Sequence, residues 1–204
     1  MSVTVPPVRP FALLEWPAHR VAVWAFLINE AFLFGSVLAA GVFLRFSGTV
    51  PWPRPGDALA VGPALVATLI LLASSATFNE SVDALRRGHA LLSRRWLAFS
   101  LLLGSIFLVI QGYEWWDLIE ASRALAPVQA GVLTVDPWGA VTFIQIFFFS
   151  TGLHGAHVLL GLALMLWLLS SGTHEQEKRL ENVALYWHFV DLVWIFILST
   201  LYLL

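Results

Sequence analysis

Five long apolar stretches alternate with short polar segments along this chain. A bilayer core about 30 Å thick is crossed by about 20 apolar residues of α-helix, and the uncharged stretches have about that length. The pattern therefore predicts a single all-α membrane domain, residues 1–204, built as a bundle of five transmembrane helices. Their approximate positions are 21–44, 58–78, 96–117, 141–171 and 182–204.

Charged residues mark the ends of these stretches. The first lies between Arg20 and Arg45 and contains Glu30 as its only ionisable residue. The segment from Pro137 to Gly172 has no acid or base except two histidines, and it is longer than one straight helix needs. We therefore expect a tilted or extended fourth helix.

Composition agrees with a lipid environment. The 204 residues are 59% hydrophobic and 12% charged, whereas a soluble domain usually has about a quarter of its residues charged. The absence of cysteine excludes disulfides, thiolate metal centres and iron-sulfur clusters, so a haem or metal site would need histidine. A net charge of −2 without a basic run excludes nucleic-acid binding.

Basic residues are distributed unequally between the two sides of the predicted bundle. Only Arg45, Arg54 and Arg123 lie on one side. Because cytoplasmic loops are enriched in Lys and Arg, we predict a cytoplasmic N-terminus and a C-terminus outside. The other eight of the eleven basic residues lie in the N-terminal segment and in the second and fourth loops: Arg9, Arg20, Arg86, Arg87, Arg94, Arg95, Lys178 and Arg179.

Two carboxyl groups are predicted to lie deep in the membrane. A charge at the bilayer centre costs about 2.5 to 3.5 kcal/mol on insertion scales, so such a residue needs a partner or a purpose. Glu30 lies ten residues beyond Arg20, which places it about 15 Å deep. Asp191 lies nine residues beyond Asn182 and enters from the same side to about 13 Å. The two residues are therefore expected to share a polar layer.

Histidines accompany these carboxyl groups. His154 and His157 are three residues apart on the fourth helix and are expected to project from one face, as are His188 and Asp191 on the fifth. A pairing of His with Asp across these two helices would satisfy both groups.

Three interpretations of the buried polar residues remain open. In the first, the polar residues form hydrogen bonds that hold neighbouring helices together. In the second, Glu30 is a proton-active carboxyl group. In the third, the HxxH spacing marks a haem or zinc site. The third is disfavoured because His154 and His157 share a helix, whereas haem ligands normally face each other. Small residues around the histidines favour close helix packing. These residues are Gly152, Gly155, Ala156 and Gly161.

Four sequence segments, taken in order, carry a family resemblance. They are "WAFLINEAFLFG" (24–35), "QGYEW" (111–115), "TGLHGAHVLLG" (151–161) and "YWHFVDLVW" (186–194). Together they resemble subunit III of haem-copper oxidases, cytochrome c oxidase subunit 3, in its short five-helix bacterial form. Glu30 takes the place of the family's buried glutamate, and Glu114 lies in the segment at the membrane exit of the third helix.

This resemblance implies an accessory subunit of a terminal oxidase in aerobic respiration, in the bacterial cytoplasmic membrane. The chain is expected to have no catalytic residue, metal or redox cofactor of its own. Its partners would be the catalytic subunit I, which holds haem and copper, together with subunit II and membrane phospholipids. It would support proton uptake and the durability of the catalytic subunit. The proton-related or buried polar residues are expected to be Glu30, Glu114, His154, His157, His188 and Asp191.

Other functions remain open at this point. The complex could be a quinol oxidase or a nitric oxide reductase, because other subunits bind the electron donor. A different class is a haem-binding membrane electron carrier. Colour separates the two classes, since an accessory subunit is colourless on its own.

Overall fold

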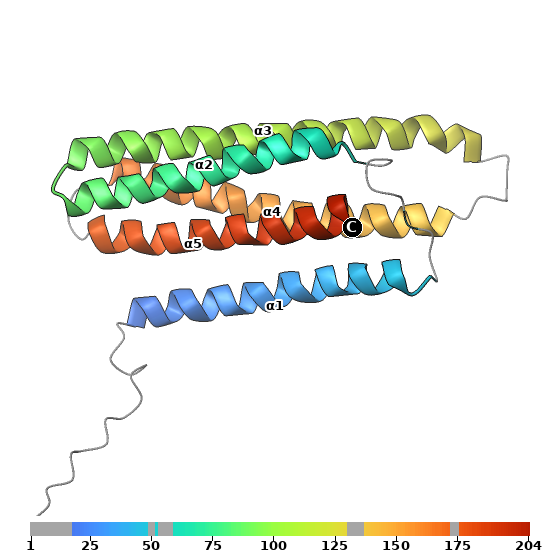
Figure 1. Cartoon of the computed structure of the whole chain (residues 1–204), viewed down its shortest axis with the longest axis horizontal. Helices are drawn as coiled ribbons and strands as arrows, with labels where there is room; N and C mark the ends of the chain where they lie inside the picture. The colour runs from blue at the N-terminus through green and yellow to red at the C-terminus, as the bar shows by residue number, and fades with distance from the viewer. Residues whose placement is uncertain (1–17, 49–51, 53–58, 130–136, 172–175) are drawn as a thin grey trace, which may run out of the picture.

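The computed structural model describes residues 18–48, 52, 59–129, 137–171 and 176–204. The regular structure in these ranges is helical, and the helices run side by side along the long axis of the molecule (Figure 1). They are α1 (Ala18–Phe46), α2 (Val61–Arg86), α3 (Ala90–Gln129), α4 (Pro137–Ser170), α5 (Gln176–Ile197) and a short π-helix, η2 (Leu198–Leu203), that continues α5.

The five-helix prediction is confirmed. Within the described residues, five helical segments are long and apolar enough to cross a membrane. Each overlaps one of the predicted stretches. The segments are 20–46, 61–86, 90–120, 142–170 and 177–203, the last of which includes η2.

The helices extend past several of the predicted spans. α2 continues from Phe78 through the polar segment as far as Arg86, and α5 begins at Gln176, before the predicted 182. The physical reason is that charge ends a membrane span but does not end a helix. Glu, Arg, Gln and Lys are good helix formers in water.

A glycine at positive φ ends α2 and starts the hairpin to α3. Gly88 has φ 80°, a conformation that is accessible to glycine at little cost. The Gly88 N–H donates to the Leu85 carbonyl and the His89 N–H donates to the Ala84 carbonyl, each at 2.9 Å. This is a Schellman motif, which satisfies carbonyls at the helix end and reverses the chain.

Buried serines join α2 to α3 along this hairpin. The Ser74 and Ser100 hydroxyls lie 3.0 Å apart, and those of Ser81 and Ser93 lie 3.1 Å apart. Each serine of α2 also donates to the backbone carbonyl of its partner at 2.9 Å. Small hydroxyl side chains let two membrane helices approach closely while each polar group is satisfied.

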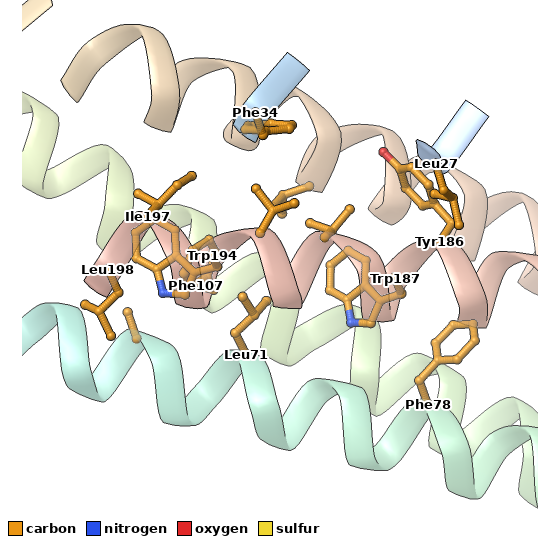
Figure 2. Close-up of a cluster of buried hydrophobic side chains, with 14 of the residues drawn as sticks. Leu27, Phe34, Leu71, Phe78, Phe107, Tyr186, Trp187, Trp194, Ile197 and Leu198 are labelled. Carbon is orange, nitrogen blue, oxygen red and sulfur yellow. The ribbon is translucent and has the colours of Figure 1, made fainter. Parts of the chain in front are cut away.

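The centre of the bundle is α5, which contacts α1, α2 and α4. Its two tryptophans, Trp187 and Trp194, are buried among side chains of the other helices (Figure 2). Trp187 occupies a slot between two glycines. A Cβ atom would lie 2.9 Å from its ring at Gly104 on α3, and 2.6 Å from it at Gly161 on α4. Gly161 therefore makes room for an indole ring.

Candidate functional site

A polar contact between side chains that are almost buried joins α1 to α4. Glu30 Oε2 lies 3.2 Å from His157 Nε2, and the two side chains are only 11% and 12% exposed. Aromatic rings enclose this mid-membrane pair, as we call Glu30 and His157. Phe34 meets the imidazole edge-on at 5.3 Å between centroids, and Tyr186 stacks on it at 6.4 Å. Tyr186 also donates its hydroxyl to the His157 carbonyl at 2.9 Å.

One ring nitrogen of His157 bonds within its own helix, and the other faces Glu30. His157 Nδ1 lies 2.8 Å from the Leu153 carbonyl oxygen, which can only accept, so Nδ1 carries a hydrogen. Nε2 therefore either accepts from a neutral carboxyl group or, as an imidazolium, donates to a carboxylate. A histidine and a carboxyl group within hydrogen-bond reach of each other are groups that can exchange a proton.

The predicted pairing of His with Asp across α4 and α5 is wrong. His154 is fully buried, and neither of its ring nitrogens has a hydrogen-bond partner among the described residues. Its imidazole stacks on Trp194 at 5.1 Å and meets Phe107 edge-on at 5.8 Å. Residues three apart on an α-helix differ by about 60° around the axis. His154 therefore faces α3 and α5, whereas His157 reaches α1.

Glu30 and Asp191, the two residues of the expected polar layer, have different neighbours. Glu30 pairs with α4, and Asp191 belongs to a group of polar residues between α2 and α5. In this α2–α5 cluster, defined as Ser75, Asn79, His188 and Asp191, His188 has both ring nitrogens engaged. Nδ1 lies 2.5 Å from Ser75 Oγ, and Nε2 lies 2.8 Å from Asn79 Oδ1.

Glu114 lies toward the opposite end of the bundle, where η2 positions its partner. Tyr202 donates its hydroxyl to Glu114 Oε2 at 2.6 Å, and Gln111 Nε2 donates to the same oxygen at 3.1 Å. The other oxygen, Oε1, is buried without a partner among the described residues. These contacts tie the C-terminal π-helix to α3.

With the geometry described, comparison with known proteins identifies the family. The family model for cytochrome c oxidase subunit III matches residues 18–204. The chain belongs to this family. It is 37% identical to cytochrome c oxidase subunit 3 of Corynebacterium diphtheriae, over 96% of this chain and 93% of that protein. It is 30% identical to cytochrome c oxidase subunit 3 of Thermostichus vulcanus, over 93% and 90%.

Membership of the subunit III family confirms the resemblance drawn from the four motifs. Each of the four motifs contributes a residue to the contacts described above, on the first, third, fourth and fifth helices. The chain also spans most of a probable cytochrome c oxidase subunit 3 of Nocardia farcinica, at 31% identity over 88% of this chain and 84% of that protein.

Metal binding finds no geometric support in this family member. Within the described ranges, no three His, Asp or Glu side chains are grouped to hold a metal ion. The HxxH histidines are separated instead, because His157 Nδ1 bonds to a carbonyl and Nε2 faces Glu30.

Several partners of the site residues escaped prediction from the sequence. Ser75 and Asn79 lie four residues apart on α2, which places them on one face opposite His188 and Asp191. Ser75 and Asn79 therefore form a polar face on the second stretch, and His188 and Asp191 form one on the fifth. Pairing these two faces would have predicted the contact. Tyr202 gave no signal, because a tyrosine near a membrane surface is ordinary.

An ion-pair network closes one end of the bundle and links three helices. Glu181 on α5 accepts from Arg20 on α1 at 2.8 Å and from Arg86 on α2 at 2.7 Å. A polar cavity of about 630 Å³ lies beside it, lined also by Asn79 and His188. The two arginine side chains are about half exposed, so solvent screens these pairs.

Replacement of Glu181 by glutamine is expected to weaken this network only modestly. Exposed ion pairs contribute about 0 to 1 kcal/mol each, and salt reduces that contribution. The thermal stability of the purified protein should fall slightly, and its dependence on salt concentration should diminish. Glu80→Gln is the matched control, because Glu80 pairs with Arg87 at 3.7 Å and is joined by no ion pair to a second helix in the described ranges. A fall of more than about 2 kcal/mol in the free energy of unfolding of Glu181→Gln would show that solvent does not screen these ion pairs.

Proposed function

We propose that this chain works as accessory subunit III of a cytochrome c oxidase in aerobic respiration, and that it supports proton uptake by the catalytic subunit. The family match over residues 18–204 carries the first part, because it covers the whole described bundle. The mid-membrane pair supports the second, because it places an imidazole 3.2 Å from a carboxyl group inside the bundle. Haem and copper belong in this proposal to the catalytic partner.

The proposed partners are the catalytic subunit I and subunit II, in the bacterial cytoplasmic membrane. The bacterial relatives favour this location. We place the N-terminus in the cytoplasm, because basic residues concentrate at the end of the bundle where α1, α3 and α5 begin (Figure 1). Arg9 and Arg54 lie outside the described residues. Those at the basic end are Arg20, Arg86, Arg87, Arg94, Arg95, Lys178 and Arg179.

A phospholipid is a further proposed partner, seated between α1 and α5. An apolar groove of about 350 Å³ lies there, lined by residues such as Phe34, Leu38 and Phe196. A second apolar hollow, near Trp24, shares lining residues with it and with the polar cavity beside Arg20. An acyl chain fits the apolar part, and a phosphate headgroup suits the basic end.

The alternative functions have less support. The named relatives are subunits of cytochrome c oxidases, which favours that complex over a quinol oxidase or a nitric oxide reductase. A haem-binding electron carrier needs histidine nitrogens free for iron. His157 uses both nitrogens in protein contacts, and His154 is enclosed by Trp194 and Phe107.

Purification of a tagged chain from native membranes in mild detergent tests the proposed function. We expect haem absorbance in the reduced-minus-oxidised spectrum, together with larger co-purifying subunits. Stripping this chain away by itself should leave the haem with those partners. Haem that stays on the isolated chain would contradict the accessory role and favour an electron carrier.

A further inference from the structure

The α2–α5 cluster connects a polar cavity to a buried carboxyl group. His188 and Asn79 line the cavity, and Asp191 lies one helical turn deeper on α5. Asp191 is 5% exposed, and no hydrogen bond of standard geometry reaches its oxygens from the described residues. Ser75 lies between the two groups, because it contacts His188 Nδ1 at 2.5 Å and also interacts with the Asp191 carboxyl group.

The hydrogen bonds of His188 restrict where its protons lie. Asn79 Oδ1 is an acceptor, so His188 Nε2 carries a hydrogen. In neutral His188, Nδ1 is then an acceptor, and the Ser75 hydroxyl donates to it. In the imidazolium, Nδ1 donates to Ser75 Oγ, which frees the serine hydrogen for Asp191. Ser75 has one hydrogen, so it serves either His188 or Asp191.

We propose that Ser75 transfers a proton between His188, at the polar cavity, and Asp191, which stores it inside the bundle. On uptake, the Nδ1–H bond of the imidazolium breaks and its proton joins Ser75 Oγ. The Ser75 O–H bond breaks at the same time, and its hydrogen forms a new O–H bond with an Asp191 carboxylate oxygen. His188 and Asp191 end neutral, Ser75 is unchanged, and the reverse step returns the proton.

The surroundings of the cluster agree with this direction of transfer. An unpaired carboxylate is costly in the membrane interior, so Asp191 favours the neutral, proton-bearing form. The charged groups around the cavity are Arg20 from α1, Asp83 and Arg86 from α2, and Glu181 from α5. They lie toward the membrane surface, where Glu181 pairs with both arginines.

The other titratable groups that face α5 have contacts of their own. On α1 and α4, Glu30 and His157 bond to each other, and His154 stacks on Trp194. The Ser75 transfer is therefore separate from the mid-membrane pair. It also needs no oxygen reduction, so its test can fail while the proposed function stands.

Hydrogen–deuterium exchange of the Asp191 carboxyl group tests this proposal in the intact complex. The carboxylic C=O band in the infrared spectrum shifts on transfer to D₂O, and Asp191→Asn identifies the Asp191 contribution by removing it. We expect the band to exchange rapidly in the natural protein. Ser75→Ala should slow the exchange at least tenfold. Ser75→Thr retains a hydroxyl and should exchange at nearly the natural rate.

A second variant keeps the test decisive if Ser75→Ala does not assemble. His188→Gln removes the imidazole and should also slow exchange of the Asp191 band at least tenfold. Natural exchange rates in assembled Ser75→Ala or His188→Gln protein would overturn the proposal. It would equally be overturned if Asp191→Asn removed no carboxylic band, since Asp191 would then store no proton.

Discussion

Replacement of Gly161 by alanine is expected to lower the free energy of unfolding by about 1 to 3 kcal/mol or more, the range for overpacked cores. The new Cβ atom would lie 2.6 Å from two ring carbons of Trp187 and 3.4 Å from Tyr186. The indole cannot retreat, because Gly104 borders its other side, where an added Cβ would lie 2.9 Å away. Unfolding in a detergent mixture, followed by circular dichroism, measures this loss.

Gly155→Ala is the matched control on the same helix. Among the residues that the structure describes, no heavy atom of a neighbouring element lies within 4 Å of a Cβ atom built at Gly155. Alanine also has a higher helix propensity than glycine by about 1 kcal/mol. Gly155→Ala should therefore leave stability unchanged or slightly raised. Equal losses in the two variants would show that the slot around Trp187 is not the cause.

Replacement of Glu30 by alanine should cost about 1 to 3 kcal/mol, the penalty for a buried polar group left without its partner. His157 Nε2 would lose its contact at 3.2 Å inside the membrane. Because this contact joins α1 to α4, retention of the subunit in the purified complex should also fall. Denaturant unfolding and the subunit ratio on a gel measure the two effects.

Glu30→Gln separates packing from proton chemistry at the same position. The glutamine amide can donate to His157 Nε2, so stability should stay within about 1 kcal/mol of the natural protein. An amide releases no proton, however, so residue 30 could no longer take part in proton transfer. We expect slower proton uptake and faster inactivation during turnover in the assembled oxidase. Natural behaviour in both measurements would leave Glu30 as a packing residue.

The number and order of the helices were predictable from the sequence, whereas several of their ends were not. Apolar length is a property of consecutive residues, so the stretch from Arg20 to Arg45 identifies a span directly. α2 extends past its predicted span because its polar segment still favours helix, and Gly88 ends it. A hydropathy pattern does not distinguish the end of an apolar span from the end of a helix.

The candidate site was predictable only in part. Glu30, His154 and Asp191 are buried in the structure, and His157 and His188 are half-buried. Their partners were not predictable, since side chains three residues apart diverge by about 60° and meet different helices. For Ser75 the only signal was its spacing from Asn79, and Tyr202 gave none, because hydroxyl groups are common in membrane helices.

The sequence by itself determined the all-α class, the five spans and the family, because apolar length and short motifs are local properties of the chain. Only the tertiary structure decided that His157 faces Glu30, that His188 meets Ser75 and Asn79, and that Gly161 holds Trp187. These contacts depend on the rotation and depth of each helix relative to its neighbours. The rotation and depth of each helix are set by packing, which depends on many small interactions between residues far apart in the chain.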